Sequence, residues 1–397
     1  MNSDPTTSQK VDGMTAVIDR PVLTDPAFTV DRAAFAAAAA QVARAIPSRP
    51  SVPILAGARL TVSGDLLTLA GYDYETSTEV TVACDGQADG TVVVSGALLA
   101  NIAKNLPNKP VSVSVEAGKA TVVCGSARFT LPTMPVDEYP ELPAMPPVSG
   151  TVDAHVFAEA VDAVKNSYGT DDTLPMLTGV YVKFEQDALT LHATDRFRLA
   201  ITTIPWESTG ALPEPVLLPG KFLAEAARGM DAGTVSLAVG DGVLGVAHGA
   251  TNSTIRLLDA EFPAVRRLLP DEHTTVAEVD VAELEQAVKR AALVSERGVQ
   301  VRLKFETGTL TVSLGDEASS ARETIPCTLA GDGIEIAFNP GYLLDGLATI
   351  DRDNVLVGMS QPSRPAVFAP SEDWQGSATD PVYDDHLYLL MPVRLPS

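Results

Sequence analysis

The chain of 397 residues contains only three cysteines, Cys84, Cys124 and Cys327, and they lie far apart without any CxxC pair. An odd number at such spacing predicts neither a disulfide framework nor a zinc site. The composition is typical of a protein from a reducing cytoplasm. We expect no metal and no cofactor.

Long apolar runs are also missing. No stretch approaches the roughly 20 apolar residues that cross a bilayer, and the N-terminus lacks a basic region followed by an apolar one. We therefore expect a soluble cytoplasmic protein. Common catalytic motifs such as GxSxG, HExxH and the P-loop do not occur. The GxGxxG match at Gly240–Gly245 lies between two strand-like runs and is interpreted as a hairpin turn.

Basic residues are scarce. The chain has 28 Lys and Arg against 51 Asp and Glu, which gives a formal net charge of −23. Proteins that bind nucleic acid usually present a basic surface to the phosphates. Composition alone therefore argues against a nucleic-acid partner.

One sequence pattern occurs three times. An apolar-Thr-apolar run leads to an aspartate six residues after its first leucine, and the aspartates are 122 and 121 residues apart. The three copies are Leu67–Asp73, Leu189–Asp195 and Leu310–Asp316. We interpret the aspartates as anchors of the turn after a strand, because the repeat contains no set of residues suited to catalysis.

Two helices are predicted in each copy. Asp31, Asp153 and Asp280 have the character of N-caps, since apolar residues follow each at offsets 4, 7, 8 and 11, which is one helical face. Glu283 completes a capping box in the third copy. A second helix follows a strand and a break near Gly96, Gly220 and Pro340. The expected helices are 31–46, 97–106, 153–166, 220–230, 280–297 and 341–351.

The runs between the helices alternate apolar and polar residues and are separated by turn residues, which is typical of antiparallel hairpins. The predicted fold class is α+β, with three similar domains that each pack two helices on antiparallel sheets. We expect a disordered arm at 1–27 and domains at 28–146, 150–270 and 275–397. Within the third domain, 370–385 is predicted to be a mobile loop and 387–395 the last strand.

The combined motifs resemble the bacterial DNA polymerase III beta subunit family, the beta sliding clamps, of actinobacterial type. The stretches that carry the resemblance are Ser48–Leu55, Leu174–Gly179, Ala193–Leu199, Glu261–Pro263, Arg266–Pro270 and Met391–Leu395. Together with the repeat they cover everything except the N-terminal arm.

The resemblance implies a non-catalytic processivity factor. Two chains would associate head to tail into a ring around duplex DNA, with helices lining the hole and sheets outside. The interface would bring Phe129 and Leu131 against Leu293 and Val294. DNA-binding candidates are Arg49, Lys104, Lys221, Arg228, Lys289, Arg290 and Arg297.

A closed ring would also account for the acidic composition, because it stays on DNA without strong phosphate contacts. The expected helices carry nine Lys or Arg and eleven Asp or Glu, so that the lining is nearly neutral.

The resemblance further implies a hydrophobic peptide pocket between domains two and three. Replicative polymerase, clamp loader and repair proteins would insert short motifs there, among adaptable apolar anchors and arginines. Its residues would be Leu177, Thr194, Arg196, Phe197, Arg198, Leu199, Pro263, Leu268, Leu389, Met391, Pro392, Val393 and Arg394.

Three alternatives stay open. A duplicate clamp that confers tolerance to a clamp-targeting inhibitor would share all these motifs. A repeat enzyme with an unrecognised site would need a cluster of titratable groups in one copy, and none is visible in the sequence. A purely structural ring or scaffold is the third.

Overall fold

The computed structural model describes residues 25–270, 272–294, 299–315, 319–371, 374, 376–378 and 385–394. Most of the predicted arm, together with Asp316, Arg297 and much of the predicted loop at 370–385, lies outside the described residues. Ala27, the last residue assigned to the arm, begins the first strand.

The chain repeats one order of elements three times. Domain one contains β1 (Ala27–Val30), α1 (Arg32–Arg44), β2 (Gly57–Ser63), β3 (Leu66–Tyr72), β4 (Thr76–Ala88), β5 (Gly90–Ser95), α2 (Gly96–Asn105), β6 (Val111–Glu116), β7 (Lys119–Cys124) and β8 (Ala127–Met134). Domain two contains β9 (Gly150–Asp153), α3 (Ala154–Val164), β10 (Gly179–Phe184), β11 (Ala188–Thr194), β12 (Arg198–Pro205), β13 (Glu207–Ser208), β14 (Val216–Pro219), α4 (Gly220–Ala227), β15 (Thr234–Gly240), β16 (Val243–His248) and β17 (Thr251–Arg256). Domain three contains β18 (Thr275–Asp280), α5 (Val281–Ala292), β19 (Val301–Glu306), β20 (Thr309–Gly315), β21 (Ser320–Pro326), β22 (Thr328–Gly331), β23 (Ile334–Phe338), α6 (Pro340–Leu347), β24 (Asn354–Met359), β25 (Ala366–Pro370) and β26 (His386–Leu390).

The predicted helix starts are confirmed. The carboxylates of Asp31, Asp153 and Asp280 accept hydrogen bonds from backbone amides in the first turns of α1, α3 and α5. In α1 the buried residues are the four at the predicted offsets. The match at Gly240–Gly245 is the hairpin turn between β15 and β16, with positive φ at Asp241 and Gly242.

Several predicted ends were too late, and α4 and α6 end at Ala227 and Leu347 rather than at 230 and 351. Helix α5 ends at Ala292, and a turn at Leu293 follows it. The last strand ends at Leu390 rather than Leu395, because the chain leaves the sheet at Met391.

The sheets do not stop at the domain boundaries. Strand β4 of domain one pairs with β17 of domain two, and β12 of domain two pairs with β26 of domain three. We call these pairings seam 1–2 and seam 2–3. Because each seam is a ladder of backbone hydrogen bonds, the sheets continue from one domain into the next.

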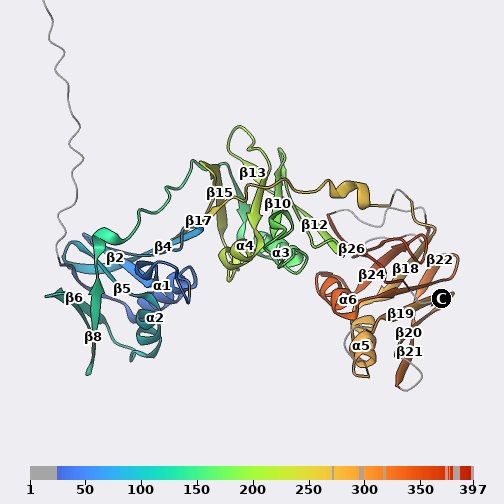
Figure 1. The fold of residues 1–397 in the computed structure, drawn as a ribbon, viewed down its shortest axis with the longest axis horizontal. Coiled ribbons are helices and arrows are strands. Elements are labelled where there is room, and N and C mark those ends of the chain that lie inside the picture. The colour runs from blue at the N-terminus through green and yellow to red at the C-terminus, as the bar shows by residue number, and fades with distance from the viewer. Residues whose placement is uncertain are drawn as a thin grey trace, which may run out of the picture.

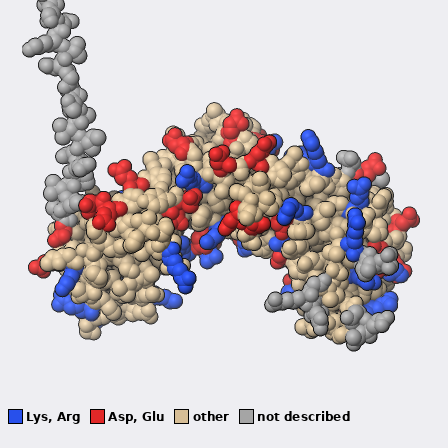
Figure 2. Space-filling view, in the orientation of Figure 1, with Lys and Arg blue, Asp and Glu red and all other residues tan. Residues whose placement is uncertain are grey.

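The three domains form an arc, with the six helices toward its concave side and the sheets toward its convex side (Figure 1). The predicted arrangement of helices inside and sheets outside therefore holds. Acidic side chains gather on the visible face of the central domain and along its convex rim (Figure 2).

Candidate functional site

Seam 2–3 has an apolar centre. Leu199 of β12 lies directly opposite Leu389 of β26, and both side chains are fully buried. They pack in one cluster with Val265 and with residues of β18, β24 and β25. Two of the predicted pocket residues therefore form the floor of the seam.

Exposed apolar side chains lie beside this floor. Phe197 is 53% exposed, Leu268 46% and Met391 37%. The backbone amide of Met391 donates to the carbonyl of Phe197 at 2.9 Å, which holds these two residues side by side. Exposed large apolar groups are unfavourable in water unless something covers them. We call this set, Leu199, Leu389, Phe197, Leu268 and Met391, the notch.

The turn before β12 presents Phe197. The Asp195 carboxylate accepts from the amides of Phe197 and Arg198 at 2.9 and 3.0 Å, so it anchors the turn as predicted. Arg196 has φ 81°, a left-handed conformation, and Tyr74 at the equivalent place in domain one has φ 72°. The local geometry therefore points the exposed side chains of Arg196 and Phe197 outward.

Arg198 lies at the junction of domains two and three. Its side chain is only 11% exposed and is held by Asp195 at 3.0 Å and by Asp345 of α6 at 2.5 Å. The guanidinium also lies over the ring of Tyr342, 4.3 Å from its centroid. Burial lowers the pKa of Arg198, but the hydrogen bond to Asp345 and the interactions with Tyr388 and Asp195 together raise it more, so the pKa is raised overall. Arg198 joins the two domains, whereas Arg196 and Arg394 lie exposed at the rim of the notch.

The other predicted residues support the notch. Leu177 is buried in the 3-10 turn Pro175–Leu177, and Thr194 is buried with its hydroxyl donating to the carbonyl of Arg198 at 2.7 Å. Pro392 and Val393 are half-buried, and the amide of Val393 donates to the carbonyl of Ala337. Pro263 is exposed.

Sequence reasoning missed two members of this region, Tyr342 and Asp345. Tyr342 stacks against Phe197 with ring centroids 6.2 Å apart. The repeat indicates both residues, because Tyr342 and Asp345 stand at the same positions in α6 as Phe222 and Glu225 in α4, the second helix of domain two.

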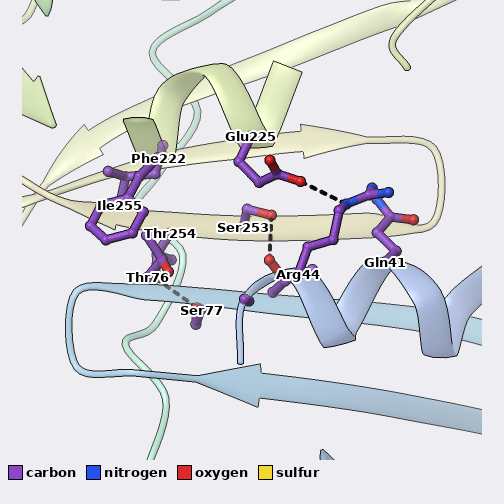
Figure 3. A pocket seen from close by; sticks show the side chains of 12 residues that line it. Gln41, Arg44, Thr76, Ser77, Phe222, Glu225, Ser253, Thr254 and Ile255 are labelled. Carbon is purple, nitrogen blue, oxygen red and sulfur yellow. Dashed lines mark hydrogen bonds and ion pairs between the residues drawn. The ribbon is translucent and has the colours of Figure 1, made fainter. Parts of the chain in front are cut away.

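Seam 1–2 lacks the apolar centre that seam 2–3 has. At the equivalent positions, Ser77 and Thr254 lie opposite each other with their hydroxyl oxygens 2.7 Å apart. Arg44 of α1 pairs with Glu225 of α4 at 3.0 Å across a cavity of about 40 Å³ (Figure 3). This polar, nearly filled seam offers no apolar floor.

All three domains match one protein family. Residues 27–143 match the N-terminal domain of the DNA polymerase III beta subunit, residues 151–264 the central domain, and residues 266–380 the C-terminal domain. The chain belongs to the beta sliding clamp family. Members of this family are non-catalytic processivity subunits, in agreement with the expectation from sequence.

Relatives and solved clamps agree along nearly the whole chain. The beta sliding clamp of Streptomyces coelicolor is 43% identical over 376 residues, covering 92% of this chain and 98% of that protein. The beta sliding clamp homolog GriR of Streptomyces muensis is 38% identical, covering 92% and 99%. The clamp of Pseudomonas aeruginosa bound to griselimycin superposes with a TM-score of 0.85 at 27% identity, covering 94% of this chain and all of that one.

The predicted subunit interface of the clamp is only partly exposed. Leu293 is 84% exposed and Phe129 37%, while Val294 is half-buried against the core. Leu131 is 1% exposed within the core of domain one. Its assignment to an open contact surface is corrected, because its side chain already packs inside its own domain.

The predicted DNA contacts of the clamp lie on or near the helices, and those in the described residues are exposed. Three of them have acidic neighbours: Arg228 pairs with Glu225, Lys289 with Glu285, and Arg290 with Glu323. Arg49 lies in the loop after α1, Lys104 in the last turn of α2 and Lys221 in the first turn of α4, and Arg297 lies outside the described residues. Helices α1 and α2 carry three basic residues and no acid, whereas α3 carries two acids and no Lys or Arg.

Two features of the described residues bear on other classes of protein. No helix among them is long and apolar enough to cross a membrane. Likewise, no group of three or more His, Cys, Asp or Glu in this part of the chain is arranged to hold a metal ion.

Proposed function

We propose that the chain works in the cytoplasm as a head-to-tail dimer that encircles duplex DNA and holds the replicative polymerase through the notch. The observation that carries this proposal is the Leu199–Leu389 floor between two domains of a beta sliding clamp. Clamp loader and repair proteins would use the same notch, since it can receive any short peptide with suitable apolar anchors.

The chemistry of the notch supports a peptide ligand. Phe197, Leu268 and Met391 present exposed apolar surface beside a rigid strand pair, and Met side chains adapt to different partners. Arg196 and Arg394 at the rim can donate hydrogen bonds to peptide carbonyls or carboxylates. The floor lies on paired strands, so it is formed before the peptide arrives.

The charge of the concave face supports sliding rather than tight binding. The first domain supplies its most basic helices and the second its most acidic helix, so the lining combines weak attraction with repulsion. We propose Arg49, Lys104, Lys221, Arg228, Lys289, Arg290 and Arg297 as phosphate contacts, each individually weak.

Calorimetry with a clamp-binding peptide tests the notch. Met391→Ala combined with Leu199→Ala should abolish peptide binding while leaving the dimer intact. Leu199→Ala alone empties a buried position and costs about 2–5 kcal/mol, so Met391→Ala is also measured alone to separate binding from folding. Leu212→Ala, an exposed leucine outside the notch, is the matched control. Unchanged affinity in the double variant would reject the notch as the site.

Loading on DNA tests the ring. The protein should remain on nicked circular DNA at high salt and be released when the circle is linearised, which a scaffold that does not encircle DNA would not do. The identity of 43% to the beta sliding clamp of Streptomyces coelicolor supports a general clamp.

A further inference from the structure

A groove lies on the surface of domain two, between the edge strand β14 and the chain that leads to domain three. Its volume is about 330 Å³, which is at the lower end of the roughly 300–1,000 Å³ of small ligand sites. Apart from Glu261 its lining side chains are apolar or aromatic, among them Tyr181, Leu217, Leu258 and Phe262. We call it the linker groove.

Domain one has the same local architecture. There Met134, at the end of the last strand, is paired with Val93 of the strand before the second helix. In domain two the amide of Leu258 donates to the carbonyl of Leu217 at 2.8 Å. The two places therefore correspond in the repeat.

Domain one fills this place with its own side chains. Two residues after Met134, Val136 begins a 3-10 turn, and it packs with Tyr139 in one cluster on Val93. Domain two has Ala260 at the position of Val136, and the chain makes no helical turn there. The smaller side chain and the extended path leave the linker groove open.

The wall of the groove is held in place by aromatic packing. Tyr181 and Phe262 are stacked, with ring centroids 5.1 Å apart and planes 9° from parallel. The buried ring of His192 lies 5.6 Å from Tyr181 and 6.3 Å from Phe262. Burial lowers the pKa of His192 to about 4, so it packs as a neutral ring. A wall formed in advance reduces the entropy cost of binding.

The linker groove adjoins the notch. Phe262 lines the groove and also packs against the cluster that contains Leu199 and Leu389, the floor of the notch. The next residue, Pro263, is exposed. One aromatic ring therefore belongs to both sites, and a segment that leaves the notch across the linker can continue into the groove.

The two sites differ in charge. Arg196 and Arg394 are exposed at the rim of the notch. At or next to the lining positions of the groove, three acids are exposed and one base, namely Glu214, Asp259, Glu261 and Arg256. Complementary charge favours the correct partner and disfavours others. The groove therefore suits an apolar side chain that has a Lys or Arg beside it.

We propose that the linker groove extends the notch and receives an apolar side chain next to a Lys or Arg from the segment that is anchored in the notch. This proposal rests on the proposed function, because the notch supplies the first anchor. The second anchor then binds as an intramolecular step, which raises the affinity without changing the notch. Partners that carry both anchors are held more tightly than partners that end at the notch.

Calorimetry with three forms of one clamp-binding peptide tests the groove. The first form covers the notch anchors alone, and the other two add a Gly-Ser spacer of varied length at either end that closes in Leu-Lys or in Ser-Glu. The Leu-Lys form should bind at least about three-fold tighter than the Ser-Glu form at one end of the peptide, because only Leu-Lys supplies the second anchor.

Two variants of the protein place the gain in the groove. Ala260→Trp puts an indole into the groove and should abolish the gain while the short peptide binds as before, which also shows that the variant is folded. Ala250→Trp, at an exposed alanine in the turn after β16, is the matched control and should keep the gain. Glu261→Lys, a surface change that leaves packing intact, should reduce the gain from Leu-Lys.

The outcomes separate the groove from the notch. If Leu-Lys gives no gain at either end, or if the gain survives both Ala260→Trp and Glu261→Lys, the groove is overturned while the notch stands. If the short peptide does not bind the unmodified chain, the notch itself is overturned, and its extension with it.

Discussion

Arg198 of β12 donates to Asp345 of α6 at 2.5 Å, and this bond ties domain two to domain three beside the notch. A second bond, 3.0 Å from Nε to Asp195, fixes the guanidinium from its own turn. Arg198, one of the residues that the family resemblance assigns to the pocket, thus also joins the two domains. The seam holds its shape through this ion pair as well as through its strand ladder.

Removing the charge of Asp345 should loosen the seam. Asp345→Asn leaves the mostly buried Arg198 with Asp195 as its carboxylate partner and should cost about 1–2 kcal/mol of stability, measured as a lower midpoint of urea unfolding. Asp351→Asn, in the exposed pair with Arg352, is the control and should stay within about 0.5 kcal/mol. Equal effects of the two variants would show that Arg198 does not hold the seam.

Replacing two glycines of α6 by alanine should have different effects on the stability of the protein. Gly346 lies against the ring of Tyr388, so a Cβ there forces the ring to move and should cost about 1–3 kcal/mol. Gly341, in the first turn, has only the Asn339 side chain near its Cβ position, so Gly341→Ala should be neutral or slightly stabilising. Thermal unfolding compares them, and a stable Gly346→Ala would contradict this packing.

Acid should destabilise seam 2–3. His386 lies between the hydroxyls of Thr202 and Thr349, and burial lowers its pKa to about 4 from 6.5. Between these two pH values His386 binds a proton in the unfolded chain but not in the folded chain. The free energy of unfolding therefore falls as the pH drops from about 6.5 to about 4, by up to about 3 kcal/mol.

Unfolding measured between pH 4 and pH 6.5 checks whether His386 causes this loss of stability. His386→Asn should flatten part of the pH dependence, leaving the share of His192, whose pKa burial also lowers to about 4. An unaltered slope in His386→Asn would exclude His386 as a source.

Charge at the predicted subunit interface should separate the proposed ring into monomers. Leu293→Glu and Phe129→Glu place a carboxylate in a contact that becomes buried in the dimer, and each should raise the dimer dissociation constant at least about ten-fold. Both side chains are exposed in the single chain, so the thermal stability of each monomer should hardly change. Leu212→Glu is the control, and sedimentation is the measurement.

Local features followed directly from the sequence. The caps at Asp31, Asp153 and Asp280 and the turn anchor at Asp195 depend on residues two to three positions away, so short patterns were enough. The helical faces followed because burial repeats with the helical period. Where the chain left regular structure, at Ala292 and Leu390, the apolar pattern continued and the predicted ends were too late.

The contacts between residues far apart in the chain could not be predicted from the sequence. Sequence showed that the unit is repeated, but only the tertiary structure showed that β4–β17 and β12–β26 join the units, because strand partners far apart in the chain leave no local signal. The same limit explains why Leu131 was placed on a surface and Asp345 was missed. The sequence by itself determined three α+β domains with their caps and turns, and tertiary packing alone decided which strands join the domains and which seam is apolar.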